Sequence, residues 1–444
     1  MHRKLITLFL LVSVLLVLGA TTLAQDDVIT VTWWVEDYVD VDLFNAAIAE
    51  PMKVNHPNID LVITPQDLGT SDILRTSLAA GEAPDILQTP GAAFIAEFLQ
   101  SGLIYDMTDA AEEFGWEDKL LPWAYQSGII DGSLYSIPLT YESMVLIYNR
   151  TLFEEQGWEV PTNLSEMEAI AEQAIAAGIN PFSYGNADWQ PTNEHLMSIY
   201  FNNYAGPEAV YQALIGEKSW DSPEFVEATE LLTTHIADNG WFSGSLETYF
   251  AYIWDDFHTE VAQGDAAMMM IGTWGFRGAS EFFAETDSEW DWAPLPVLSD
   301  NVQDYNYALA TGSTLSVNAE TENPEAVLTA INWMMDHPQN VLELASGYAY
   351  GEFMIPLFFQ TEDFPEDADT RIVRFYADFA EVTGEGRVGY TTWTFWPANA
   401  NVQLWESVEN VWFGELGVAD YLAEHQALWE QARAEGVTPP VPER

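Results

Sequence analysis

Residues Pro138 to Arg150 read Pro-Leu-Thr-Tyr-Glu-Ser-Met-Val-Leu-Ile-Tyr-Asn-Arg, and this stretch decides the fold. Its second half, from Met144 to Tyr148, is a continuous apolar run rich in β-branched and aromatic residues, which predicts a buried strand. A polar step that includes Glu142 precedes it, where a fully buried element would be apolar throughout. Because ligands favour clefts between domains, a strand that leaves one lobe and enters another behind a carboxylate predicts a hinge that contacts a ligand.

The chain on either side of this hinge alternates strands and helices. Strands are expected over residues 28–34 and 59–64, and helices over residues 41–55 and 71–80. Asp131-Gly132 predicts the turn of a hairpin that leads into the hinge. Beyond the hinge, a new set of helices begins, which indicates a second lobe.

Two further motifs and the hinge strand carry a resemblance to a known family. Residues 81–87, Gly-Glu-Ala-Pro-Asp-Ile-Leu, resemble the Gly-x-x-Pro-Asp-Ile/Val turn of bacterial extracellular solute-binding proteins of the maltose-binding type. Residues 264–274 resemble that family's Gly-x-Ala-Ala-Met strand, which delivers a Trp to the cleft. The hinge strand resembles its first crossover strand, where a Glu at the position of Glu142 faces the sugar.

The resemblance implies an α/β fold with two lobes, each a mixed sheet flanked by helices, joined by a hinge of crossover segments. It also implies a receptor of an ABC importer that captures a carbohydrate, an oligosaccharide or glycoside, between the lobes. Closure of the lobes would then present the solute to a membrane-embedded permease. We expect a monomer that is not an enzyme and needs no cofactor.

The chain divides into a leader, two discontinuous lobes and a tail. Residues 2–4 are basic, residues 5–18 are almost wholly apolar, and small residues follow up to Ala24, which predicts a signal peptide over residues 1–24. The apolar run is short for a transmembrane span. Lobe 1 is expected over residues 25–140 and 297–355, lobe 2 over residues 141–296 and 356–436, and a Pro-rich tail over residues 437–444. The crossovers are expected near Tyr141, Pro296 and Ile355.

Charge and cysteine content exclude several classes of function. The formal net charge is −57, and such a field repels phosphate backbones and anionic lipid, so neither nucleic acid nor a membrane surface is an expected partner. The chain has no cysteine, hence no disulfide, no thiolate nucleophile and no lipobox for a lipid anchor. We expect a secreted protein, periplasmic or extracellular, without a lipid anchor. No spacing typical of a metal site is present, so no metal is expected.

One match to a nucleotide-binding motif is rejected. Residues 384–389 fit G-x-G-x-x-G, but a dinucleotide site needs a strand before the motif and a helix after it. Here a helical stretch precedes the motif, which indicates a loop.

The candidate ligand residues are aromatic or acidic and lie near expected strand ends or in segments that resemble the family's cleft. A Trp plane can cover the apolar face of a sugar while a carboxylate or amide accepts or donates hydrogen bonds to its hydroxyls. For any single Trp, core packing is the alternative, and for any acid, a solvated surface. The candidates are Trp34, Glu36, Asp37, Thr89, Tyr141, Glu142, Trp189, Trp274, Trp393 and Trp396.

Two alternatives stay open. A secreted carbohydrate-active enzyme could draw an acid pair from Glu36, Asp37 and Glu142. A protein of the same fold could instead bind a polyol or polyamine. The second alternative arises because the residues after the Pro84-Asp85 turn offer only Gln88 and Thr89 for hydrogen bonds, where sugar-binding members of the family often place polar or charged residues.

Overall fold

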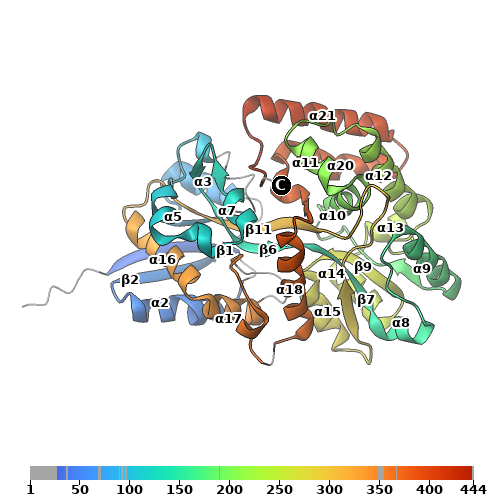
Figure 1. Cartoon of the computed structure of the whole chain (residues 1–444), viewed down its shortest axis with the longest axis horizontal. Coiled ribbons are helices and arrows are strands. Elements are labelled where there is room, and N and C mark those ends of the chain that lie inside the picture. The colour runs from blue at the N-terminus through green and yellow to red at the C-terminus, as the bar shows by residue number, and fades with distance from the viewer. Residues whose placement is uncertain are drawn as a thin grey trace, which may run out of the picture.

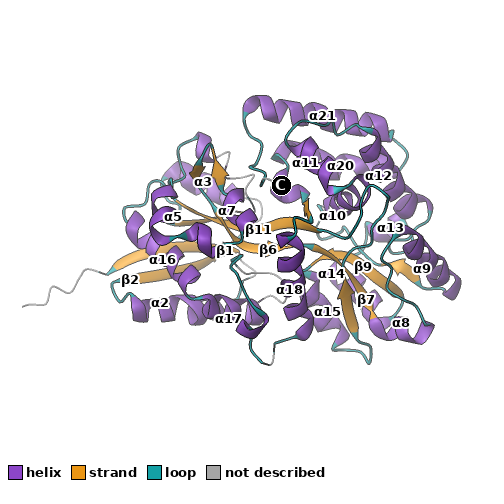
Figure 2. Ribbon diagram, in the orientation of Figure 1, coloured by secondary structure: helices purple, strands orange, loops and turns teal. Residues whose placement is uncertain are grey.

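The structure is a computed structural model, and it shows two lobes side by side (Figures 1 and 2). It describes residues 28–36, 39–68, 72–89, 91, 95, 98–189, 191–348, 355–366 and 368–442. The predicted signal peptide and Asp37 lie outside the described residues. The two-lobe α/β architecture predicted from the hinge stretch is confirmed.

The first sheet has six strands; most of it forms the core of lobe 1, while its end strand β12 packs against α11 (Pro207–Leu214) of lobe 2. Five of them lie in the order β12-β11-β3-β1-β2, and β6 pairs with β11. The β1–β2 and β1–β3 pairs are parallel, whereas β11 runs antiparallel to β3 and β6. The strands are β1 (Ile29–Glu36), β2 (Ile59–Gln66), β3 (Ile86–Thr89), β6 (Ile137–Glu142), β11 (Tyr307–Val317) and β12 (Val388–Tyr390).

The second sheet has four strands in the order β10-β7-β9-β8 and forms the core of lobe 2. Every residue of β9 is buried, and so is all of β7 except the half-buried Tyr148, as the apolar run in the sequence predicts. The strands are β7 (Met144–Asn149), β8 (Asn180–Phe182), β9 (Ala266–Gly272) and β10 (Trp290–Ala293). The predicted hairpin forms β4 (Ile129–Ile130) and β5 (Ser133–Leu134), with Asp131 and Gly132 at positive φ in its turn.

Helices pack around both sheets. Those of lobe 1 are α1 (Val41–Phe44), α2 (Glu50–Asn55), α3 (Asp72–Ala80), α5 (Thr108–Phe114), α6 (Trp116–Lys119), α7 (Pro122–Ser127), α16 (Pro324–Asp336) and α17 (Pro338–Tyr348). Those of lobe 2 are α8 (Arg150–Gln156), α9 (Leu164–Ala177), α10 (Thr192–Tyr200), α11 (Pro207–Leu214), α12 (Pro223–Thr233), α13 (Leu246–Tyr249), α14 (Trp254–Gln263), α15 (Gly275–Phe283), α19 (Thr392–Phe395), α20 (Ala398–Trp412) and α21 (Val418–Glu435).

The chain crosses between the lobes three times, and the second crossing differs from its expected place. The first follows Glu142, where β6 ends and β7 begins. The second was expected at Pro296; however, Val297 still bridges to Asn163 in lobe 2, and Leu298 N–H donates to the Asn203 carbonyl. The chain crosses inside β11 instead, where its register with β6 shifts between Ala310 and Ser313. A single long strand therefore serves both lobes.

The third crossing lies beyond Ile355. Leu357 still bridges to Leu120 in lobe 1, so the chain leaves that lobe only after this residue. It then enters α18 (Thr370–Gly384), which stands between the lobes in Figure 1. On one face of α18, Phe375 packs against Trp292 of lobe 2, and Phe379, one turn further on, packs against Trp123 of lobe 1. This helix is therefore part of the hinge.

Arginines fasten the start of α18 to the edge strand β10. The Arg371 guanidinium lies 3.8 Å from the centre of the Trp290 ring and donates to the Trp290 carbonyl at 3.1 Å. Arg374 repeats the arrangement over Trp292, 4.6 Å from the ring centre, and donates to its carbonyl at 2.9 Å. These contacts satisfy carbonyl groups that an edge strand leaves unpaired.

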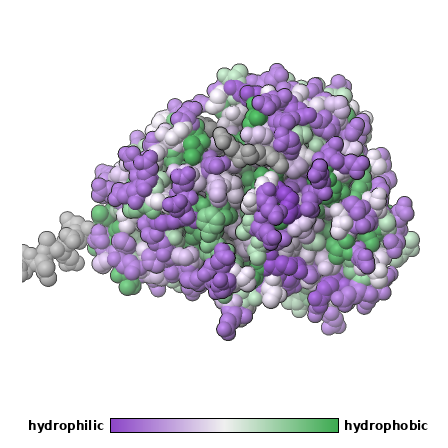
Figure 3. All heavy atoms as spheres, viewed as in Figure 1, coloured by the Kyte–Doolittle hydropathy of each residue, from purple (hydrophilic) through white to green (hydrophobic). Residues whose placement is uncertain are grey.

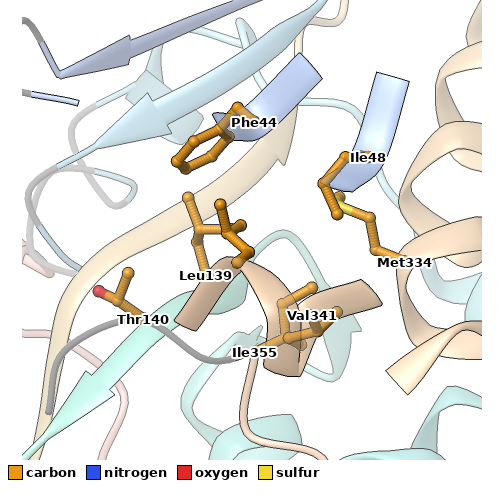
Figure 4. Close-up of a pocket in the computed structure, with 8 residues that line it drawn as sticks. Phe44, Ile48, Leu139, Thr140, Met334, Val341 and Ile355 are labelled. Carbon is orange, nitrogen blue, oxygen red and sulfur yellow. The ribbon is translucent and has the colours of Figure 1, made fainter. Parts of the chain in front are cut away.

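The surface and the lobe 1 interior contrast in polarity. Figure 3 shows hydrophilic residues over most of the visible face, in keeping with the acidic composition. Inside lobe 1, Phe44, Ile48, Leu139 and Met334 point toward one another around a small apolar pocket next to α16 and α17 (Figure 4). Among the described residues, no helix is long and apolar enough to cross a membrane.

Candidate ligand-binding site

Glu142 ends β6 at the first crossing and is only 7 % exposed. Its Oε1 accepts a hydrogen bond from the Trp393 indole N–H at 3.2 Å. The carboxylate lies over the backbone of β11, because a Cβ at Gly312 would meet Glu142 Oε2 at 3.0 Å and Thr140 Oγ1 at 2.8 Å. A glycine at position 312 is therefore needed for Glu142 to take this place.

Trp274 is brought beside Glu142 by the pairing of β7 with β9. Met144 lies opposite Gly272, and the Thr273 N–H donates to the Ser143 carbonyl at 2.9 Å. Trp274 then precedes α15, half-buried, with its ring folded back over Gly272. A Cβ at Gly272 would come within 2.0 Å of that ring, so this glycine allows the indole to lie against the strand.

Trp274, Trp393 and His195 form one aromatic cluster next to Glu142. The two indole ring centres are 5.8 Å apart at 74°, an edge-to-face contact. The His195 ring lies 4.9 Å from Trp274 and 5.1 Å from Trp393. Both indoles are half-buried, so each keeps part of its surface for another molecule. We call these three residues together with Glu142 the hinge cluster.

His195 is a neutral member of the hinge cluster. Burial lowers its pKa to about 3, so the ring is uncharged at neutral pH. Its Nδ1 lies 2.6 Å from the Tyr184 hydroxyl, and burial raises the pKa of Tyr184 well above its usual range. We assign the shared proton to Tyr184, because an imidazole nitrogen is a better acceptor than a phenol oxygen; Nε2 then carries the ring hydrogen.

Glu194 lies directly behind the cluster. It is 4 % exposed, and its Oε2 accepts from the Thr392 hydroxyl at 3.1 Å. Burial raises the pKa of Glu194 to about 7, although hydrogen bonds from Asn401 and Thr392 lower it. Neither Glu194 nor His195 was predicted. Both belong to α10, in which every side chain is buried, and no motif in the sequence marks it.

The candidates from lobe 1 lie on or just after β1 rather than in the hinge cluster. Trp34 packs against a small apolar cluster around Leu74 and Phe98. Glu36 is 8 % exposed and accepts from the Leu68 N–H at 3.2 Å. These contacts give both residues structural roles within lobe 1. Asp37 lies outside the described residues.

The candidate Thr89 and its neighbour Gln88 end β3. The Thr89 hydroxyl is shared with Thr314 at 2.7 Å and with the Gly91 carbonyl at 3.1 Å, and both Thr89 and Gln88 are buried. The end of β3 does approach the hinge cluster, since a Cβ at Gly91 would lie 3.5 Å from the Trp393 carbonyl.

Three aromatic candidates have other environments. Tyr141 is 3 % exposed and packs among Trp123, Tyr376 and Phe379, in the hinge core rather than on a surface. Trp396 is 1 % exposed, with its ring against Trp220 and Trp429 and its N–H donated to His425. We therefore correct both to core residues. Trp189 is 51 % exposed and lies three residues before α10.

The G-x-G-x-x-G match is confirmed as a loop. Gly384 ends α18, Gly386 has φ +77°, and Val388 starts the short strand β12. The order is helix, loop, strand, the reverse of what a dinucleotide site needs. Within the described ranges, no group of three or more His, Cys, Asp or Glu side chains is arranged to hold a metal ion.

A family model described as bacterial extracellular solute-binding protein matches residues 37–341, more than half of the chain. The chain belongs to this family. Among its relatives are a maltotriose-binding protein of Pyrococcus abyssi, 21 % identical over 72 % of this chain and 64 % of the relative, and a probable sugar-binding periplasmic protein of Mesorhizobium japonicum, 25 % identical over 45 % of this chain and 47 % of the relative. The chain thus spans about half to two thirds of these curated relatives.

Solved structures share this fold over most of the chain. A chitin oligosaccharide binding protein superposes with a TM-score of 0.74 at 18 % identity, covering 91 % of this chain and all (100 %) of that one. The maltose-bound protein of T. maritima gives a TM-score of 0.69 at 18 % identity, covering 91 % of this chain and 99 % of that one. At these identities the likeness establishes the two-lobe fold of this family member.

Proposed function

We propose that this protein is the solute receptor of an ABC importer and that its ligand is a neutral carbohydrate, an oligosaccharide or glycoside. The hinge cluster carries the proposal. Two half-buried indoles can cover the C–H faces of sugar rings, Glu142 accepts hydrogen bonds from hydroxyls, and the neutral His195 donates one through Nε2. The relatives named for maltotriose and for sugars support the same class of ligand.

The geometry also supports capture by closure. Glu142 sits at the first crossing, and Trp393 follows β12, which pairs with the shared strand β11. A ligand bound to the hinge cluster therefore touches the segments that must bend when the lobes move. We propose that the closed form is presented to a membrane permease, and that the protein works outside the cytoplasmic membrane as a monomer without a lipid anchor.

A calorimetric panel tests this function. Maltotriose, raffinose and a chito-oligosaccharide represent sugars, while spermidine and a polyol represent the other solutes. We expect binding to at least one sugar and its loss in Trp393→Ala. Binding to spermidine alone would overturn the carbohydrate proposal. Release of shorter sugars during incubation would show instead that the protein is an enzyme.

A further inference from the structure

Glu194 is a buried carboxylate that is linked to two members of the hinge cluster, His195 and Trp393. Along α10 it neighbours His195, and across to α19 it accepts from the hydroxyl of Thr392, the residue before Trp393. Thr392 is fully buried and opens α19, whose four residues include Trp393. The carboxylate of Glu194 thus holds the start of the short helix that carries one of the two indoles.

The surroundings of Glu194 fit two protonation states. Asn401 hydrogen-bonds to the carboxyl group, while the Asn401 Oδ1 is buried without a hydrogen-bond partner. An ionised Glu194 accepts from the Asn401 amide and from Thr392. A protonated Glu194 could donate to Asn401 Oδ1 after the amide turns over, and its hold on Thr392 would weaken, because hydrogen bonds to an ionised acceptor are about twice as strong as neutral ones.

We propose that Glu194 is a positioning residue of the ligand site: its ionised carboxylate holds Thr392 and thereby sets the indole of Trp393 against Glu142, without touching the ligand. This rests on the proposed function only in taking Trp393 as a ligand contact. Affinity should therefore be higher when Glu194 is ionised, above about pH 7, and lower when it is protonated.

The other titratable groups around Glu194 either have pKa values far from 7 or can be replaced by single substitutions. His195 has its pKa lowered to about 3, and the pKa values of Tyr184 and Tyr249 are raised by burial. On α20, burial raises the pKa of Glu409, which accepts from Asn193 and neighbours Glu406.

The remaining elements packed against α10 add no competing group. Neither α19 nor β9 contains a titratable side chain. On α12, Glu227 and Glu230 are exposed and Glu224 pairs with Lys218. Asp188 lies before α10 and accepts from the Trp254 N–H at 2.7 Å. Among these groups, Glu409 and the hinge carboxylate Glu142 are the two that need control variants.

The test reads the indole directly in the ligand-free protein. With 5-fluorotryptophan incorporated, Trp393→Phe identifies the fluorine resonance of Trp393. We expect that resonance to shift with a midpoint near pH 7 in the wild-type protein, to stop titrating in Glu194→Gln, and to keep its midpoint in Glu142→Gln and Glu409→Gln. A resonance that does not titrate near neutral pH would overturn the proposal, as would a titration lost in Glu142→Gln and retained in Glu194→Gln.

A second variant keeps the proposal testable if Glu194→Gln fails to fold. Thr392→Val removes the hydroxyl but leaves Glu194 in place, so the Trp393 resonance should no longer follow its ionisation. A wild-type titration in Thr392→Val would rule out the route through Thr392. With maltotriose, raffinose or chitotriose, whichever binds, affinity should fall severalfold from pH 8 to pH 6 in the wild-type protein but not in Glu194→Gln. The fluorine measurement needs no sugar. It therefore tests the role of Glu194 even if none of these sugars binds.

Discussion

Within the hinge stretch, Glu142 belongs to the proposed ligand site, whereas its neighbour Tyr141 does not. Glu142 accepts the Trp393 indole N–H, while its neighbour Tyr141 faces the hinge core. Successive residues of a strand point to opposite faces, so only one of the two can reach a ligand on a given face. Because of this alternation, Glu142 belongs to the proposed site and Tyr141 does not.

Replacing Glu142 by Gln should weaken ligand binding without unfolding the protein. The change keeps the size of the side chain but exchanges one acceptor for a donor, so one sugar hydroxyl would face the wrong partner. A poorly paired buried polar group costs about 1–3 kcal/mol, which corresponds to a roughly tenfold or greater loss of affinity. Calorimetry and thermal melting of the same variant separate the roles: lower stability with unchanged affinity would show that Glu142 is structural.

Trp274 can be tested by removing its ring or by displacing it. Trp274→Ala should cost on the order of 2 kcal/mol of binding energy if the indole stacks on the ligand. Gly272→Ala is the matched variant, since its added methyl would come within 2.0 Å of the ring and force it away. Both should reduce affinity in calorimetry while circular dichroism stays native. Native affinity in both variants would assign Trp274 to packing alone.

At the scale of elements, the Gly-x-x-Pro-Asp turn joins segments that are far apart in the sequence. The Asp85 carboxylate accepts from the Thr32 N–H at 2.8 Å and the Thr32 hydroxyl at 2.7 Å. Its other oxygen accepts from the Thr321 hydroxyl at 2.6 Å, just before α16. One side chain therefore connects β1, β3 and the approach to α16, which explains an acid at this turn without any ligand.

Asp85→Ala should therefore lower stability and leave binding unchanged in the folded fraction. Three donors lose their acceptor, and the site is only partly buried, so water replaces part of the loss. We expect a decrease of about 1–3 kcal/mol in the free energy of unfolding, measured by urea denaturation. Thr321→Val removes one of the three hydrogen bonds and should cost less. An unchanged urea midpoint in Asp85→Ala would show that Asp85 does not stabilise the connection between β1, β3 and the approach to α16.

At the scale of the whole molecule, ligand binding should close the lobes. The first two crossings run through β6 and β11, and α18 packs on both lobes, so bending is confined to these segments. Binding proteins of this shape close around their ligands by hinge motion. Small-angle scattering should give a smaller radius of gyration at saturation with a sugar that binds in calorimetry. An unchanged radius would argue against closure.

Acid should destabilise the whole molecule below neutral pH. Burial lowers the pKa of His195 and His425 to about 3 and of His235 and His258 to about 4. Depressed pKa values contribute stability that is full above the unfolded value of 6.5 and is lost as pH falls toward the folded values. Glu194 acts in the opposite direction, because its raised pKa favours the folded state as pH falls through about 7.

Four histidines outweigh the three glutamates whose pKa values burial raises, Glu194, Glu260 and Glu409, so the free energy of unfolding should fall between pH 6.5 and pH 5. Each histidine adds a slope of up to about 1.4 kcal/mol per pH unit. Urea denaturation at half-unit intervals measures the trend. Glu194→Gln is the matched control: it should make the decline steeper, because the opposing proton uptake is gone. A flat or rising stability over this range would contradict the assignment.

The sequence by itself determined the features that depend on local pattern. The apolar run after Glu142 could only be a buried strand, and glycines and Pro84-Asp85 marked turns whose backbone geometry is set within a few residues. The succession of strands and helices then indicated two lobes, and the resemblance gave their connection. These properties follow from neighbours in the chain, so no tertiary information is needed to read them.

The tertiary structure decided which buried residues meet. Trp274, Trp393 and Trp396 look alike in the sequence, yet β7–β9 pairing and the short helix α19 bring the first two to Glu142, whereas α21 covers the third through Trp429. Glu194 and His195 joined the site only because α10 packs against α19. The second crossing also shifted into β11, since one strand can pair at each end with a different lobe. The pattern of one segment predicts which of its residues are buried, but the packing of segments decides which residues they contact.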